Sequence, residues 1–225
     1  MTTEAIKSEI ESGSAIVGIE FGSTRIKAVL IASDNAPVAQ GSHTWENSLV
    51  DGIWTYSEAE IIAGLQSAYA DLKLDVKEKY GVTLKTLRAL GISAMMHGYL
   101  AFGKDDKLLV PFRTWRNTIT GAASEQLSAL FGYPIPERWS ISHLYQAILN
   151  GEPHVKDVAF FTTLAGFIHW KLTGKKVLGI GDASGMFPID TSTKDFNKDF
   201  IAKFDALVAD KKFGWKLADL FPKVL

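Results

Sequence analysis

The stretch that decides the fold is residues 16–31, which read IVGIEFGSTRIKAVLI. Apolar runs at Ile16–Gly22 and Ile26–Ile31 flank a short turn of small, polar residues, Ser23–Arg25. This pattern is typical of two buried strands joined by a tight turn. A third run, Val38–Trp45, follows a turn rich in Ser, Asp, Asn and Pro. The sequence therefore predicts a three-stranded antiparallel meander at the start of the fold.

Helical and strand patterns alternate after this meander. The clearest helix begins at a capping box, Ser57–Glu60, and ends at Gly81, with apolar residues at helical spacing between them. A strand over Leu87–Ala94 and a hairpin over residues 99–110 come next. Further helices are predicted over residues 122–130, 141–149, 164–172 and 200–208. This order predicts an α/β fold with a mixed β-sheet flanked by helices.

The composition is that of an ordinary globular protein. The 225 residues include 24 basic and 25 acidic side chains, for a net charge of −1, and 47 % are hydrophobic. Balanced charge argues against a nucleic-acid partner, and the absence of cysteine excludes a disulfide scaffold, a zinc finger and a cysteine nucleophile. Neither a secretory signal nor a membrane-spanning run is present, so we expect no membrane partner and a cytoplasmic location. We expect a flexible lead-in over residues 1–14 and one domain over residues 15–225.

The end of the first predicted strand combines a carboxylate with a turn suited to phosphate. Glu20 comes just before Gly22, Ser23 and Thr24. The backbone N–H groups and hydroxyls of such a turn can approach phosphate oxygens, and a carboxylate beside them is a natural magnesium ligand. The alternative is an ordinary hairpin in which Glu20 faces solvent. The chain has neither a Walker A loop nor a dinucleotide-binding glycine fingerprint.

Three further segments have side chains suited to ligand binding. In Met95–Gly98, at a predicted strand end, His97 can bond a sugar hydroxyl, or it can be a core histidine between core methionines. Residues 113–117, RTWRN, combine an aromatic plane with polar donors, as sugar sites do, or form a surface loop anchored by its tryptophan. Residues 182–187, DASGMF, provide a second carboxylate-bearing loop, or a turn in which Asp182 caps the next element.

Taken in order, these segments resemble the N-terminal domain of the FGGY carbohydrate kinases, which belong to the actin, hexokinase and Hsp70 fold group. Residues 18–30 resemble the first phosphate loop of that family. Met96–Gly98 is similar to the sugar-site motif of its xylulokinase-like members. Trp115–Asn117 falls where the family has a tryptophan and a sugar-contacting aspartate. Residues 172–174 and 182–185 resemble its Leu-Thr-Gly and Asp-Ala-Ser stretches.

The resemblance extends over residues 15–225 and implies a ribonuclease H-like domain of the actin/hexokinase ATPase type. It implies ATP and Mg²⁺ as cofactors and a small sugar as substrate. It assigns cofactor binding to Glu20, Gly22, Ser23, Thr24 and Lys27, with Glu20 as the metal ligand. It assigns sugar binding to Met96, His97, Gly98, Trp115, Arg116 and Asn117.

Four positions depart from the pattern of the family. Glu20 stands where Asp is usual, which bears on magnesium geometry. Met95 replaces a glutamine, Asn117 stands where Asp is common, and Ile119 stands where Arg is frequent. These changes leave the identity of the sugar open.

In this family the catalytic base and the adenosine site lie beyond the N-terminal domain. The resemblance therefore implies that the base falls beyond Leu225, that the chain has no catalytic residue of its own, and that a C-terminal nucleotide-binding lobe, absent here, is its partner in cis. We expect the N-terminal domain of an ATP-dependent kinase that phosphorylates a hydroxyl of a ketose such as xylulose, inactive as this fragment. The alternatives are a non-catalytic sugar-binding or interaction module of kinase-like fold, and a kinase for glycerol, gluconate or a hexulose. A homodimer is also left open.

Overall fold

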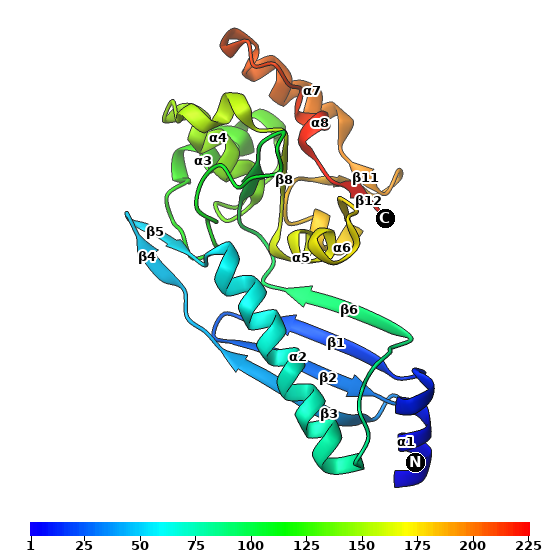
Figure 1. The fold of residues 1–225 in the computed structure, drawn as a ribbon. Helices are drawn as coiled ribbons and strands as arrows, with labels where there is room; N and C mark the ends of the chain where they lie inside the picture. Colours follow the sequence, from blue (N-terminus) through cyan, green and yellow to red (C-terminus); the bar gives the residue numbers. More distant parts are fainter. The chain divides into compact units, whose positions relative to one another are not determined.

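The structure is a computed structural model that describes residues 1–225. The chain forms two compact units, and each is described by itself. Unit 1 comprises residues 1–47 and 56–95, and unit 2 comprises residues 48–55 and 96–225. Figure 1 shows the elements of both units along the chain.

Unit 1 is built on a four-stranded sheet with the order β3-β2-β1-β6. Its strands are β1 (Ile16–Phe21), β2 (Arg25–Ile31), β3 (Pro37–Thr44) and β6 (Ala89–Ala94). The first three pair antiparallel, whereas β6 runs parallel to β1. The predicted meander and the predicted mixed sheet are therefore confirmed. Along β1, Val17, Ile19 and Phe21 are at most 2 % exposed and alternate with outward-facing residues, so one face of the sheet is apolar and buried.

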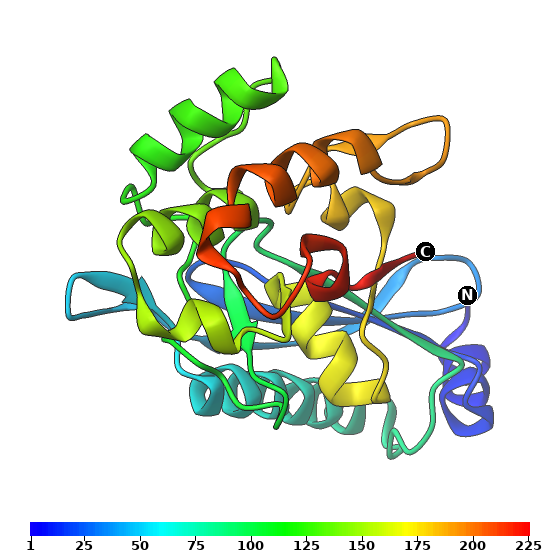
Figure 2. The same ribbon diagram turned by 90° about the horizontal axis from the view of Figure 1, so that it is seen from above.

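The long helix α2 (Glu58–Tyr80) lies along one face of this sheet, as Figures 1 and 2 show. It begins at the predicted capping box. The Ser57 hydroxyl accepts the Glu60 N–H at 3.1 Å, and the Glu60 carboxylate accepts the Ser57 N–H at 2.8 Å. It ends at Gly81, whose φ of 71° closes the last turn in the left-handed conformation.

Helix and sheet approach each other closely at Gly41 in β3. A Cβ atom added there would lie 2.1 Å from the Leu72 backbone nitrogen and 2.4 Å from the Ala68 carbonyl oxygen. Both atoms belong to the α2 backbone, which cannot move aside as a flexible side chain can. The packing of α2 on β3 therefore depends on glycine at this position.

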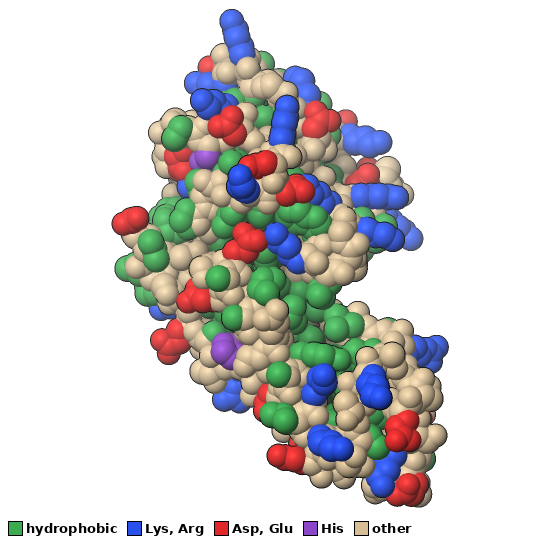
Figure 3. Space-filling view, in the orientation of Figure 1, with side chains coloured by type: hydrophobic (Ala, Val, Ile, Leu, Met, Phe, Trp, Pro, Cys, Tyr) green, Lys and Arg blue, Asp and Glu red, His purple; other side chains and the backbone are tan.

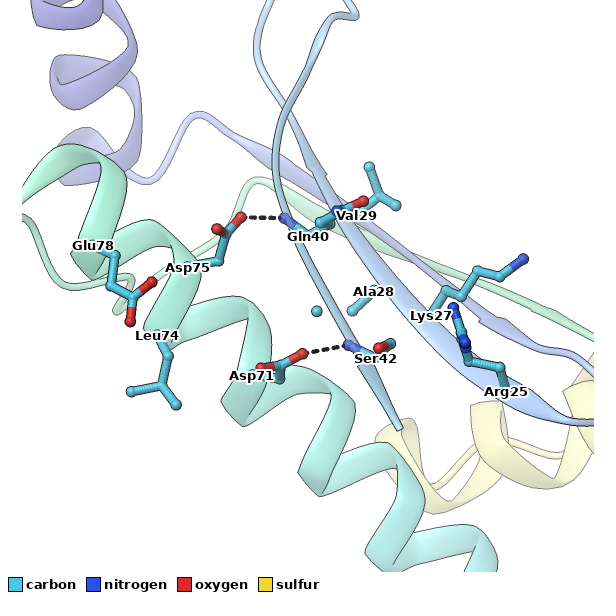
Figure 4. A pocket seen from close by; sticks show the side chains of 11 residues that line it. Arg25, Lys27, Ala28, Val29, Gln40, Ser42, Asp71, Leu74, Asp75 and Glu78 are labelled. Carbon is cyan, nitrogen blue, oxygen red and sulfur yellow. Dashed lines mark hydrogen bonds between the residues drawn. The ribbon is translucent and has the colours of Figure 1, made fainter. Parts of the chain in front are cut away.

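Carboxylates of α2 also bond the open edge of β3. The Asp75 carboxylate accepts the Gln40 N–H, and the Asp71 carboxylate accepts the Ser42 N–H, both at 2.8 Å (Figure 4). These residues line a depression of about 390 Å³. Because an edge strand exposes unpaired backbone groups, these bonds protect β3 from pairing with another chain.

The first helix, α1 (Thr3–Ser12), corrects the prediction of a flexible lead-in over residues 1–14. The Thr2 hydroxyl caps its first turn, and Gly13 ends it with a φ of 72°. Ile10 is only 1 % exposed, so the helix is attached to unit 1 by a core side chain. The prediction failed because a single buried residue in a polar stretch gives a weak periodic signal.

Unit 2 contains six α-helices, joined by short strands. The helices are α3 (Gly121–Phe131), α4 (Ser140–Leu149), α5 (Leu164–Thr173), α6 (Ile180–Ala183), α7 (Lys198–Leu207) and α8 (Leu217–Leu220), with 3-10 turns at Pro153–Asp157 and Ala209–Lys211. The four helices predicted between residues 122 and 208 are confirmed as α3, α4, α5 and α7. The short helices α6 and α8 were not predicted, because four residues are too few to show a helical period.

The strands of unit 2 form two-stranded pairs. These are β4 (Ser48–Val50) with β5 (Ile53–Thr55), β7 (Leu100–Phe102) with β8 (Phe160–Thr162), β9 (Val177–Leu178) with β12 (Lys223–Val224), and β10 (Ile189–Asp190) with β11 (Asp195–Phe196). The hairpin predicted over residues 99–110 is reduced to one isolated bridge, which pairs Phe102 with Leu108. The regular partner of β7 is β8, which lies nearly sixty residues later in the chain.

The core of unit 2 is rich in aromatic rings. Phe221 stacks on Phe196 at a centroid distance of 4.1 Å and lies 5.2 Å from Phe161 and 5.4 Å from Phe187. This cluster joins β8, β11 and the segment after α8. Aromatic burial thus connects the last residues of the chain to its middle.

None of the helices is both long enough and apolar enough to cross a lipid bilayer. On the face drawn in Figure 3, acidic and basic side chains occur on both units, in keeping with the balanced charge of the chain.

Replacing Gly41 with alanine should destabilise unit 1, because the added methyl group meets the α2 backbone. We expect the free energy of unfolding to fall by about 1–3 kcal/mol, the usual range for overpacking. Chemical denaturation measures this, with Gly18→Ala in β1 as the matched control, since nothing lies within 4 Å of its added Cβ. Equal stability of the two variants would contradict the close approach of α2 to β3.

Candidate functional site

The predicted phosphate loop forms one surface depression in unit 1. Strand β1 ends at Phe21 and β2 begins at Arg25, so the turn between them consists of residues 22–24. The Gly22 N–H donates to the Arg25 carbonyl at 3.0 Å and closes the turn. The depression has a volume of about 560 Å³ and is lined by Glu20, Gly22, Ser23, Thr24, Arg25, Lys27 and Thr44. All five residues predicted to bind the cofactor therefore lie around one space.

Glu20 and Lys27 face each other across β1 and β2. They are register partners, and the Lys27 ammonium lies 3.2 Å from a Glu20 carboxylate oxygen. Both side chains are about half exposed, at 54 % and 52 %. Glu20 thus faces solvent, as the simpler interpretation holds, and also lines the depression. An exposed ion pair of this kind contributes only about 0–1 kcal/mol, so a ligand can readily displace it.

Two aromatic residues that the sequence analysis did not identify hold the turn in place. The Trp45 indole N–H donates to the Gly22 carbonyl at 2.8 Å, and the Tyr56 hydroxyl donates to the Ser23 carbonyl at 2.6 Å. The two rings stack at a centroid distance of 4.1 Å. Because the C=O and N–H of one peptide point in opposite directions, these bonds direct the Ser23 and Thr24 amides away from the aromatic pair.

The Met96–Gly98 segment of unit 2 has a constrained backbone. His97 has a φ of 74° and Gly98 a φ of 100°. At Gly98 an added Cβ would lie 2.7 Å from the Arg113 carbonyl oxygen and 2.8 Å from the Phe112 ring. The left-handed conformation at a non-glycine residue is uncommon and is often found at functional sites. Only glycine fits at residue 98, which turns the chain immediately after the His97 side chain.

The ring of His97 is held by the Asp182–Gly185 segment. Its Nδ1 lies 3.3 Å from the Gly185 carbonyl oxygen, so Nδ1 is the protonated, donating nitrogen. Burial and the charge of Arg138 lower the pKa of His97 against the opposing effect of the Gly185 bond. The ring is therefore neutral near pH 7, and Nε2 has a lone pair that can accept a hydrogen bond.

Gly185 brings two of the predicted segments together. An added Cβ at Gly185 would lie 2.8 Å from His97 Nδ1 and 3.0 Å from Met96 Cε. Met96 is 38 % exposed, so it is not a core methionine. Both segments are candidate sites from the sequence, but nothing in the sequence indicates their contact, since 88 residues separate His97 from Gly185.

Asp182 is not a helix cap, because it lies within the short helix α6, whose N-cap is Gly179. Its carboxylate accepts a hydrogen bond from the Thr163 hydroxyl, which itself caps α5. Burial raises the pKa of Asp182, and the Thr163 bond opposes this only in part. The carboxylate therefore links α5 to α6 and the segment that holds His97.

The Trp115–Asn117 segment divides into exposed and buried residues. Trp115 is 43 % exposed and offers an aromatic surface. Arg116 lies over the Trp54 ring, with 3.9 Å from its guanidinium carbon to the ring centroid. Trp54, in β5, was not predicted as a site residue, because neither β4 nor β5 was predicted from the sequence.

Asn117 is only 3 % exposed, and its amide bonds the backbone. Its Oδ1 accepts the Trp54 N–H at 2.9 Å, and its Nδ2 donates to the Trp54 and Thr114 carbonyls at 2.8 and 3.0 Å. In this conformation Asn117 fixes the β4–β5 hairpin, and both ends of its amide are bonded to backbone groups. A buried asparagine satisfied in this way is a structural contact.

Residues 15–211 match the family model of the FGGY family of carbohydrate kinases, N-terminal domain. Three similar solved structures are a xyloylose kinase from Brucella ovis (18 % identity, TM-score 0.78), and a xylulose kinase (20 %, 0.75) and a gluconate kinase (19 %, 0.76) from Lactobacillus acidophilus.

Each of these structures is matched over 94 % of this chain, but only over 42–43 % of its own length, so the chain spans less than half of each. These likenesses show the actin/hexokinase ATPase fold that the resemblance to the FGGY kinases implied. On the extent of the family match, the chain belongs to the FGGY family of carbohydrate kinases and corresponds to its N-terminal domain.

Proposed function

We propose that this chain is the sugar-binding part of an ATP-dependent kinase that phosphorylates a hydroxyl of a ketose such as xylulose. The observation that supports this best is the state of His97, which is neutral, fixed by Gly185, and has Nε2 available as an acceptor. A fixed acceptor beside apolar surface is the combination that a sugar site needs. Because the chain spans less than half of the kinases that it resembles, we propose binding without turnover for the chain alone.

In this proposal the side chains of unit 2 divide the recognition of the sugar. His97 Nε2 accepts a hydrogen bond from one hydroxyl. The exposed surfaces of Met96 and Trp115 contact the C–H groups of the sugar. Gly98 allows the turn that presents His97, whereas Asn117 contributes by fixing Trp54, on which Arg116 stacks.

The residues of the phosphate loop fit ATP and Mg²⁺ in their chemistry. One carboxylate, three hydroxyls and the cationic groups of Arg25 and Lys27 line the same depression, and no group of three or more His, Cys, Asp or Glu side chains forms a separate metal cage. This suits Mg²⁺, which usually takes one or two carboxylates together with phosphates and water. ATP with Mg²⁺ supplies the phosphoryl group and neutralises its charge. Glu20 would hold the metal, Lys27 a phosphate oxygen, and the Ser23 and Thr24 hydroxyls and amides the remaining phosphate contacts.

The function is tested by calorimetry of the chain with xylulose, a hexulose, gluconate and glycerol, together with an assay of ATP turnover. We expect a ketose to bind most tightly and turnover to stay at the level of a blank. Tightest binding of gluconate or glycerol would reassign the substrate. Robust turnover would overturn the proposal that the chain binds without catalysing, and binding of none of the four would favour an interaction module.

Replacing His97 with asparagine should weaken sugar binding about 10- to 100-fold, since the loss of one hydrogen bond that leaves a sugar hydroxyl unpaired in the site costs about 1–3 kcal/mol. Asparagine tolerates the left-handed backbone, so the melting temperature should change little.

For the unchanged protein, the affinity for sugar should be constant above about pH 6.5 and fall at lower pH, because the pKa of His97 lies below the usual 6.5 and an imidazolium cannot accept a hydrogen bond.

The matched control is His169→Asn, a half-buried histidine of the same unit outside the site. Calorimetry measures the sugar affinity of both variants, and thermal melting shows whether each is folded. A folded His97→Asn variant that binds sugar as the unchanged chain does would remove His97 from the site.

Replacing Glu20 with glutamine should remove the magnesium-dependent part of phosphate binding. With magnesium tripolyphosphate as the probe, we expect an affinity loss of about tenfold or more, as for other changes around a bound metal. The measurement is the shift in melting temperature with and without Mg²⁺. Glu46→Gln changes an exposed acid of the same unit outside the depression and should behave like the unchanged chain. The same magnesium response in both variants would contradict a role for Glu20 in metal binding.

A further inference from the structure

Unit 2 contains a buried ionic cluster. Two of its residues directly adjoin the sugar segments, which are Met96–Gly98 and residues 114–117. Its members are Tyr99, Arg113 and His154, at 0, 6 and 8 % exposure, and Glu152, whose side chain is 23 % exposed. No role was assigned to Tyr99, Glu152 or His154 from the sequence. Buried charges are rare unless they are paired, so this cluster needs a physical explanation.

The four side chains form a continuous chain of contacts. The Arg113 guanidinium donates to a Glu152 carboxylate oxygen through Nη2. The same oxygen lies 3.5 Å from Nδ1 of His154, and Nε2 of His154 lies 3.1 Å from the Tyr99 hydroxyl. The Arg113 guanidinium also lies over the Tyr99 ring, 5.7 Å from its centroid, which closes the contacts into a ring.

The charges in this cluster balance at neutral pH. Burial raises the pKa of Glu152, but its contacts, chiefly the hydrogen bond and charge of Arg113, together lower it further, so the net shift of the pKa is downward and Glu152 is ionised. Burial lowers the pKa of His154, which is therefore neutral. A neutral His154 can donate from Nδ1 to Glu152 and accept the Tyr99 hydroxyl at Nε2. One cation and one anion remain, and Glu152 supplies the anion.

The cluster is joined to the sugar segments through the backbone. Tyr99 and Arg113 exchange both backbone hydrogen bonds, at 2.9 and 3.1 Å. Gly98 and His97 come directly before Tyr99, and Thr114 and Trp115 come directly after Arg113. Any movement of the Arg113 side chain that shifts its backbone therefore also shifts the segments that present His97 and Trp115.

We propose that Glu152 is a positioning residue for the sugar site: by pairing with the buried Arg113, it fixes the Tyr99–Arg113 bridge and, through that bridge, the His97 and Trp115 segments. Arg113 already has one nitrogen, Nη1, that is buried without a hydrogen-bond partner. Without Glu152 its whole charge would be uncompensated in the interior, a strongly unfavourable state that is relieved by moving toward water. This role rests on the proposed sugar-binding function, and Glu152 itself does not touch the sugar.

The test compares Glu152→Gln with Glu152→Asp. Glutamine keeps the size of the side chain but removes the charge, whereas aspartate keeps the charge. We expect Glu152→Gln to weaken binding of the ketose about tenfold or more at temperatures where it is fully folded, and Glu152→Asp to restore part of this loss. Hydrogen exchange at the Tyr99 and Arg113 amides should become faster in Glu152→Gln. The control Asp106→Asn removes an exposed ion pair with Lys176 in the same unit and should change neither readout.

Three results would overturn the proposal. One is a folded Glu152→Gln variant with unchanged sugar affinity. Another is a variant whose affinity falls while exchange at the two amides stays the same. The third result applies if the Glu152→Gln variant does not fold. In that case the proposal fails if a folded Glu152→Asp variant has the same hydrogen exchange at these two amides and the same sugar affinity as the unchanged chain.

The experiment distinguishes failure of the proposed sugar-binding function from failure of the positioning role of Glu152. If the unchanged chain binds no sugar, the function fails, but hydrogen exchange at Tyr99 and Arg113 still reports whether Glu152 fixes the bridge. If the chain binds sugar and the exchange of the Glu152→Gln variant is unchanged, the positioning role fails alone.

Discussion

The register between β1 and β2 is the constraint on which the geometry of unit 1 depends. Side chains alternate along a strand, so burying Val17, Ile19 and Phe21 forces Glu20 to the opposite face. The same register places Lys27 directly across from Glu20. A slip of one residue in either strand would turn the charge of that strand, Glu20 or Lys27, toward the core, which is strongly unfavourable. The apolar core of the sheet thus decides on which face Glu20 and Lys27 lie.

In unit 2 a single backbone bridge, between Tyr99 and Arg113, has a comparable role in fixing the local geometry. Tyr99 and Arg113 pair outside any regular strand, and Gly98 leaves no room for a side chain beside the Arg113 carbonyl. The bridge joins segments that would otherwise be loops. The side chains of the bridge are bonded to further interior groups, Tyr99 to His154 and Arg113 to Glu152, so a buried polar network adjoins it. Sites held in this way can keep an acceptor such as His97 Nε2 in a fixed orientation.

Local patterns in the sequence were enough for most of the architecture. Three such features are the capping box at Ser57, the terminating Gly81 and the apolar alternation of β1. Each depends only on residues a few positions away, so each can be predicted from the sequence alone. The helix α1 and the hairpin β4–β5 were missed for the opposite reason. One has a single buried residue and the other has exposed side chains at Leu49 and Val50, and neither produces a periodic apolar signal.

For the site, the sequence by itself determined which residue types are present and their order, and this was sufficient for the family. It also determined the depression around Glu20 to Lys27, since those residues are adjacent on one hairpin. Only the tertiary structure decided that Gly185 holds His97, that Asn117 is occupied by the Trp54 backbone, and that Glu152 compensates Arg113. These contacts join residues 39 to 88 positions apart. No local propensity specifies such pairs, because they form only when the packing of the core brings distant segments together.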